Sequence, residues 1–124
     1  MEAVFSPTGL LSQAANFEYR PQQQEMAGAV ARALAAGEHL LVEAGTGVGK
    51  SLAYLVPAIL DAVARKRKAI ISTHTINLQE QLIGKDLPML AGILPVEFNF
   101  TMLKGRGNYV CTRRLHKVMQ QADG

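Results

Sequence analysis

The sequence lacks the features of exported and membrane proteins. Among its 124 residues there is one cysteine, and there is no tryptophan. A single cysteine excludes an internal disulfide framework, so we expect a reducing, cytoplasmic compartment. The N-terminus shows no basic and apolar signal sequence, and the longest apolar run, Leu52–Leu60, contains Pro57 and is too short to cross a bilayer. The sequence therefore predicts neither export nor a membrane anchor.

Hydrophobic residues, in contrast, make up 48% of the chain, which is enough for one domain with a buried core. The net charge is +3, and the basic residues are concentrated in Arg65–Lys68 and in a second group. Such blocks are compatible with a polyanionic partner. For the first block another interpretation stays open, because basic residues at a helix end complement its dipole. The second group consists of Lys104, Arg106, Arg113, Arg114 and Lys117.

Residues 40–51, with the sequence LLVEAGTGVGKS, form the most informative segment of the chain. An apolar run leads into a glycine-rich loop that opens a helix, which is the order required of a phosphate-binding loop. Gly45, Gly47 and Gly49 lack a Cβ, so the backbone can turn its N–H groups toward a phosphate. The positive end of the following helix dipole favours the same anion. The segment therefore predicts a nucleoside triphosphate site.

Two side chains in this loop carry the chemistry. Lys50 would contact the β- and γ-phosphates, and the Ser51 hydroxyl would take one coordination position on Mg²⁺. Ala44 stands where the pattern usually begins with glycine, which is a mild departure. Within the loop, the residues predicted to bind the nucleotide are Ala44, Gly45, Thr46, Gly47, Val48, Gly49, Lys50 and Ser51.

The surrounding pattern predicts an α/β fold. Pro21 suits the first turn of a helix that Gly37 would close. The short apolar runs 39–43 and 69–73 are typical of strands covered on both faces, and a helix from residue 49 to about 65 lies between them. This order predicts a right-handed βαβ unit of a P-loop, RecA-like parallel sheet, in an incomplete first motor lobe. Pro57 should kink or break its helix.

The rest of the chain is less regular. Residues 1–18 have no sustained periodicity and are predicted to be an irregular lead-in. A short helix is expected from residue 78 to about 83, a third strand at 98–103 and a last helix at 113–121. We assign 19–103 to the ATP-binding domain and 104–124 to the start of a further region.

Four segments read in order resemble one helicase family. Residues 19–26 (YRPQQQEM) resemble the adenine-recognition segment of superfamily 2 helicases, and residues 43–51 resemble their motif I. Residues 71–82 (ISTHTINLQEQL) resemble motif Ia, and residues 103–111 (LKGRGNYVC) resemble the segment before the first iron-sulfur cysteine. Together they resemble the DinG/YoaA branch of the XPD-like DNA helicases. The resemblance implies a DNA helicase that is driven by ATP and moves 5′ to 3′.

The resemblance also implies roles for residues outside the loop. Gln23 would bond the adenine edge with the support of Arg20, although Gln22 or Gln24 could face the base instead. Single-stranded DNA would be contacted by Ser72, Thr73, Thr75, Lys104 and Arg106, because hydroxyls and cations bind phosphates without reading sequence.

Cys111 would be the first ligand of a 4Fe-4S cluster in a longer protein, and residues 104–124 would be the start of the iron-sulfur cluster region. A cluster of this type needs further thiolates, and a buried free cysteine is the alternative.

Other parts of the family pattern are not found in these residues. We find no acidic D-E-x-H box on a later strand, no further cysteines and no second motor lobe. The sequence is therefore expected to be the N-terminal part of a helicase. The alternative is a nucleotide-binding module or remnant without motor activity. Missing strands would leave an open sheet edge, so we expect the isolated chain to aggregate unless a partner covers it.

Overall fold

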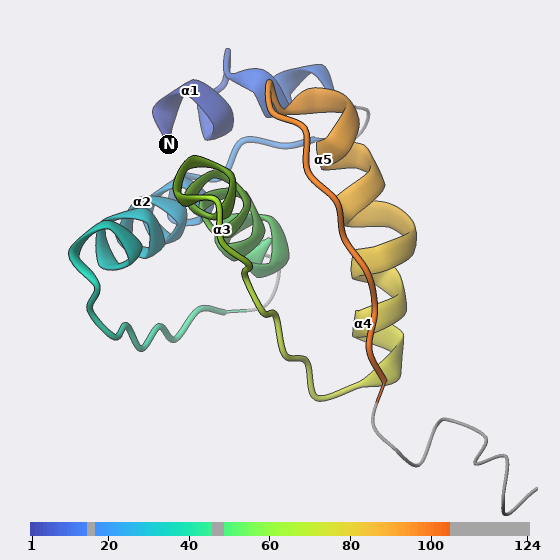
Figure 1. Ribbon diagram of the computed structural model, residues 1–124. Helices are drawn as coiled ribbons and strands as arrows, with labels where there is room; N and C mark the ends of the chain where they lie inside the picture. Colours follow the sequence, from blue (N-terminus) through green and yellow to red (C-terminus); the bar gives the residue numbers. More distant parts are fainter. Residues whose placement is uncertain (15–16, 46–48, 105–124) are drawn as a thin grey trace, which may run out of the picture.

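The computed structural model describes residues 1–14, 17–45 and 49–104. Helices dominate these ranges, and no strand is found within them. Helix α3 packs mainly against α2 and also contacts the η2 turn (Figure 1). Their bounds in chain order are α1 Glu2–Phe5, η1 Leu10–Gln13, α2 Pro21–Ala36, α3 Lys50–Arg65, α4 Ile76–Gln81, η2 Leu82–Asp86 and α5 Leu87–Ile93.

Helix α2 confirms the prediction made from its end residues. Pro21 occupies the first turn, where its missing N–H costs no helical hydrogen bond. Gly37 closes the helix with φ of 68°, and its N–H donates to the carbonyls of Ala33 and Leu34. Glycine adopts this left-handed conformation without the steric cost of a Cβ. The helix therefore begins and ends where its sequence indicates.

Helix α3 also forms where it was expected, from Lys50 to Arg65. The break expected at Pro57 is not found, since the helix continues through this residue. Pro57 is buried, as are Leu55 and Val56 beside it. We attribute the continuity to packing, because burial of an apolar helix face offsets the loss of one backbone hydrogen bond.

The N-terminal segment is not irregular, contrary to the sequence prediction. It forms α1 and the single 3₁₀ turn η1. Phe5 and Leu11 are both 0% exposed and belong to the same hydrophobic core as Ala53 and Val56 of α3. The sequence prediction failed because four-residue helices are too short to show a periodicity. Residues 1–14 therefore contribute to the core that supports α3.

The predicted short helix at 78–83 is part of a longer helical stretch. Helix α4 runs into the π-helical turn η2, which continues into α5. Pro88 lies in the first turn of α5, where proline is tolerated, so it does not end the stretch. Asp86 is buried in η2, and burial raises the pKa of its carboxyl although Lys85 lowers it. Leu90 and Leu94 extend the core beyond η2.

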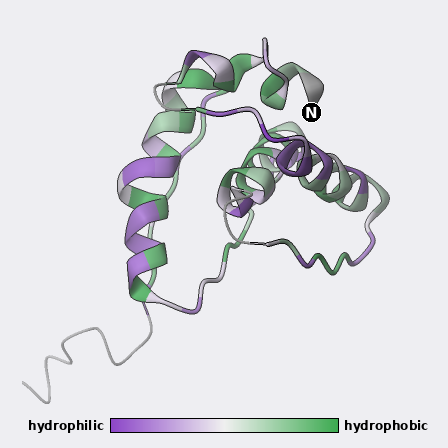
Figure 2. Ribbon diagram, turned by 180° about the vertical axis from the view of Figure 1, so that it is seen from behind, coloured by the Kyte–Doolittle hydropathy of each residue, from purple (hydrophilic) through white to green (hydrophobic). Residues whose placement is uncertain are grey.

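The runs predicted as strands are extended but unpaired within the described residues. Figure 1 shows the segments after α2 and after α3 as extended traces beside the helices. Leu41 is 98% exposed and Ile70 is 92% exposed. Figure 2 colours parts of these two segments green, which marks hydrophobic residues. The parallel sheet is thus not confirmed, and the physical reason is that a buried parallel strand needs neighbours and covering layers on both faces.

The third predicted strand, 98–103, is also extended without a partner strand in the described part of the chain. It runs beside α5 and α4 (Figure 1). The rings of Phe98 and Phe100 lie 6.0 Å apart. Gln79 of α4 donates a hydrogen bond from Nε2 to the carbonyl of Leu103 at 3.0 Å. The helix predicted at 113–121 lies outside the described residues.

Candidate nucleotide-binding site

The candidate site begins at the residue that opens α3. Gly49 is the N-cap of this helix and has φ of 81° and ψ of 48°. Its carbonyl accepts the first helical hydrogen bond, from the N–H of Ala53 at 3.3 Å. Lys50 is exposed and Ser51 is half-buried at the start of the helix. The two side chains predicted to act on phosphate and Mg²⁺ therefore lie at the positive end of the α3 dipole.

The first turn of α2 contacts Gly49 as well. Gln23 is 2% exposed, and its Nε2 donates a hydrogen bond to the carbonyl of Gly49 at 3.0 Å. A Cβ built on Gly49 would collide with Nε2 of Gln23 and would lie 3.5 Å from Nη1 of Arg20. The structure thus brings Arg20 and Gln23, which are distant in sequence from the loop, against its last glycine.

The three consecutive glutamines differ in their surroundings. Gln22 is exposed, Gln24 is half-buried, and only Gln23 is buried at the junction of α2 and α3. Within the described residues, the buried Oε1 atoms of Gln23 and Gln24 have no hydrogen-bond partner. A buried acceptor without a partner is costly, so these oxygens suit a ligand donor. Ala27, one helical turn after Gln23, is 0% exposed, so Gln23 lies on the buried face of α2.

The remaining loop residues are only partly described. Ala44 is half-buried and Gly45 is exposed, and a Cβ on Gly45 would meet nothing within 4 Å. Thr46, Gly47 and Val48, which were predicted to bind ATP, lie outside the described residues. The observed part of the site is therefore the start of α3 together with the first turn of α2.

The chain matches a known protein family over most of its length. The family model of the DEAD/DEAH box helicases matches residues 20–107. The chain belongs to the DEAD/DEAH box helicase family. Both Gln23 and Gly49 fall inside the matched range. Membership of this helicase family implies a P-loop NTPase fold, of which the described residues contribute the helices.

Individual relatives of the family cover most of the chain. ATP-dependent helicase DinG of Mycobacterium tuberculosis (strain ATCC 25618 / H37Rv) is 51% identical over 108 residues, or 84% of this chain and 16% of that protein. ATP-dependent DNA helicase YoaA of Escherichia coli (strain K12) is 46% identical over 114 residues, or 91% of this chain and 17% of that protein. YoaA of Haemophilus influenzae is 44% identical over 119 residues. The chain spans 16 to 18% of the length of these relatives.

The hydroxyl-rich turn that resembles helicase motif Ia lies between α3 and α4. Ser72 and Thr75 are exposed and Thr73 is half-buried. The Thr75 hydroxyl caps α4 by accepting a hydrogen bond from the N–H of Leu78 at 3.2 Å, and Thr73 Oγ1 donates to the Thr75 carbonyl at 3.2 Å. Two of the predicted DNA-binding hydroxyls therefore also shape the turn itself.

The second predicted DNA-binding group is described only at Lys104. Its Nζ lies 3.9 Å from Oε1 of Glu80 on α4. Arg106 and Cys111 lie outside the described residues. One cysteine does not fit a 4Fe-4S cluster by itself, and the described residues contain no group of three or more histidine, cysteine, aspartate or glutamate side chains placed to hold a metal.

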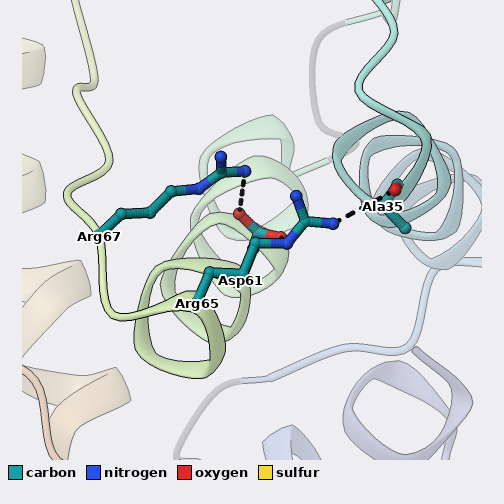
Figure 3. Close-up of polar contacts among 4 residues, drawn as sticks. All are labelled: Ala35, Asp61, Arg65 and Arg67. Atoms are coloured by element: carbon teal, nitrogen blue, oxygen red, sulfur yellow. Dashed lines mark hydrogen bonds and ion pairs between the residues drawn. The ribbon is translucent and has the colours of Figure 1, made fainter.

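In the first basic block, Arg65–Lys68, the two arginines make contacts that stabilise the fold. Asp61 of α3 is paired with Arg65 Nε at 3.0 Å and with Arg67 Nη2 at 3.1 Å (Figure 3). Arg65 Nη2 also donates to the carbonyl of Ala35 near the end of α2, at 3.2 Å. These contacts join the C-terminal ends of α2 and α3, so they favour the structural interpretation of the block.

Among the described residues, no helix is long and apolar enough to cross a membrane.

Proposed function

We propose that this chain is the N-terminal part of an ATP-dependent DNA helicase, with a nucleotide site formed by the start of α3 and the first turn of α2. The observation that carries the proposal is the buried contact between Gln23 and Gly49 at 3.0 Å. It joins the predicted adenine-recognition segment to the predicted phosphate loop. The names of the DinG and YoaA relatives support ATP dependence and action on DNA.

Each residue has a role that follows from its chemistry. Lys50 would neutralise the β- and γ-phosphates, and the free N–H groups of the first turn of α3 would donate to them. Ser51 would hold Mg²⁺, which neutralises phosphate charge when it is bound. The buried Oε1 of Gln23 would accept from the adenine amino group. Arg20 lies beside this contact and would support it.

Single-stranded DNA would bind across the turn before α4. Ser72, Thr73 and Thr75 would donate to its phosphates, with Lys104 and Arg106 adding positive charge. We further propose that Cys111 is the first cluster ligand in a longer, cytoplasmic protein, and that the helicase moves 5′ to 3′. The paired parallel sheet predicted from the sequence would form once further strands of that protein cover the exposed runs.

DNA-stimulated hydrolysis of ATP by the complete natural polypeptide that carries residues 1–124 tests this function. We expect Lys50→Ala to abolish the DNA-stimulated rate, because it removes the ammonium group that would contact the β- and γ-phosphates. Lys85→Ala is the matched control, since Lys85 is an exposed lysine on η2 and should not affect the rate. Full activity of Lys50→Ala would refute the assignment. A wild-type protein that binds ATP without any turnover would instead favour a nucleotide-binding module.

A further inference from the structure

We infer that Gln23 is a positioning residue for the phosphate loop and acts on triphosphate binding whatever base the nucleotide carries. This inference rests on the proposed nucleotide site and adds a role to Gln23. The proposed recognition of adenine uses the Oε1 atom of the Gln23 amide. The structure shows a second use of the same amide, because its Nε2 is bonded to the backbone of the loop itself.

The bonded carbonyl belongs to the residue that determines where α3 begins. The Gly49 oxygen accepts from two donors, Nε2 of Gln23 at 3.0 Å and the N–H of Ala53 at 3.3 Å. The second of these is the first hydrogen bond of the helix. A side chain from α2 thus fixes the plane of the peptide that joins Gly49 to Lys50, and with it the direction in which the first turn of α3 presents its N–H groups.

Steric contact adds to the hydrogen bond. Gly49 adopts a left-handed conformation, and the space that a Cβ would occupy there is filled by the Gln23 amide, whose Cδ lies 3.1 Å from the Cβ position. Gln23 is itself 2% exposed, so it has little freedom to leave this position. The amide therefore fills the cavity behind the glycine as well as bonding its oxygen.

The position of Gln23 follows from helix packing. Gln23 lies on the face of α2 that packs on α3, one turn before Ala27, which is 0% exposed. Its neighbour Gln22 is exposed on the same turn. Gln23 is thus placed by the core, and Gln23 in turn holds Gly49, the last glycine of the loop. Lys50 and Ser51 follow directly, so their orientation toward any triphosphate depends on the same contact.

Inorganic tripolyphosphate separates the two roles, because it has no base. We would titrate the complete natural protein, in the presence of Mg²⁺, with ATP, GTP and tripolyphosphate. For Gln23→Ala and Gln23→Met we expect the dissociation constants for GTP and tripolyphosphate to rise by about 3- to 10-fold, as for loss of one hydrogen bond. The constant for ATP should rise by at least as much. Gln22→Ala is the matched control and should change none of them.

A purely structural role is distinguished by the same titration. Loss of folded protein lowers the number of binding sites and the melting temperature, but leaves the dissociation constant of the remaining folded molecules unchanged. Gln23→Met keeps a side chain of similar length and removes the N–H donors without adding a charge beside the phosphates, so it answers the question if Gln23→Ala does not fold. If the dissociation constants for GTP and tripolyphosphate rise for both variants while the number of binding sites is unchanged, the positioning role of Gln23 is supported.

Two results would overturn the inference. If the variants weaken ATP binding alone, Gln23 reads the base and does not position the loop. If they weaken no ligand, the contact with Gly49 has no functional role. Failure of the proposed function gives a different result. Either the wild-type protein would bind neither ATP nor tripolyphosphate, or Lys50→Ala would bind both with the affinity of the wild type. In both cases the inference about Gln23 would be overturned together with the proposed function.

Discussion

The two predicted ligand sites are built in different ways. At the nucleotide site, Gln23 reaches a residue 26 positions away and is buried between two packed helices. At the predicted DNA site, the hydroxyls of Thr73 and Thr75 bond to groups two and three residues away, in exposed surroundings. The nucleotide site therefore depends on tertiary packing, whereas the DNA-side turn is formed locally. Substitutions at the first should affect the whole fold, and substitutions at the second should affect one helix end.

The largest effect should come from Gly49→Ala on the nucleotide side. A left-handed conformation costs a non-glycine residue about 1 to 3 kcal/mol, and the new Cβ would also collide with the Gln23 amide. We expect a loss of unfolding free energy at or above the upper end of this range, together with weaker ATP binding. Denaturant titration and ATP titration measure the two effects.

Gly37→Ala is the matched control for this substitution. Gly37 has φ of 68°, but a Cβ there would meet nothing within 4 Å. It therefore carries the conformational cost without the collision. The difference between the two variants reports the contact with Gln23, and equal losses would show that this contact does not matter.

On the DNA side, Thr75→Ala should have a smaller and local effect. It removes the side-chain cap of α4, which is typically worth about 1 kcal/mol. We expect this loss by chemical denaturation, with unchanged affinity for ATP. Thr75→Ser keeps the capping oxygen and should retain most of the stability. Weaker ATP binding in Thr75→Ala would contradict the separation of the two sites.

Asp86 lies in η2, which contacts α3 and follows α4, so it connects the two regions. Burial raises the pKa of its carboxyl above the ordinary value. The folded state therefore binds the proton more tightly than the unfolded state, so stability is gained in acid and lost as pH rises through the folded pKa. We expect Asp86→Asn to be more stable than wild type at neutral pH, with an advantage that fades toward acid. Thermal melts of both proteins from acid to neutral pH measure this difference in stability. A difference that does not vary with pH would contradict the raised pKa of Asp86.

The smallest effect is expected for Gln79→Ala. Its hydrogen bond to the Leu103 carbonyl is exposed, and surface substitutions usually change stability by less than about 0.5 kcal/mol. Melting temperature should barely change. A large loss would mean that the segment 98–103 is held to α4 mainly through this side chain, and the DNA side would then depend on tertiary contacts too.

The sequence predicted the parts of the fold that have local signals. Pro21 and Gly37 mark the ends of α2, and the glycine-rich loop marks the start of α3. The burial of Phe5 and Leu11 was missed, because α1 and η1 are too short for a periodic pattern. The continuity of η2 into α5 was not predicted, and Pro88 does not interrupt it because this residue lies in the first turn of α5. The paired strands depend on neighbours that the described residues do not supply.

The candidate site was predicted to a similar extent. The roles of Lys50 and Ser51 follow from residue types and spacing alone, and they remain predictions. The choice among the three adjacent glutamines requires knowing which face of α2 packs on α3. Only the structure gives the contact between Gln23 and Gly49, because it joins residues that no local pattern links.

Amide hydrogen exchange of the complete natural protein, with and without ATP and Mg²⁺, tests most directly whether the first turn of α2 and the start of α3 form one nucleotide site. We predict that ATP slows exchange in 20–24 and in 49–53 together, and that Lys50→Ala removes the protection of both. Protection confined to one segment, or protection that persists in Lys50→Ala, would contradict a shared site.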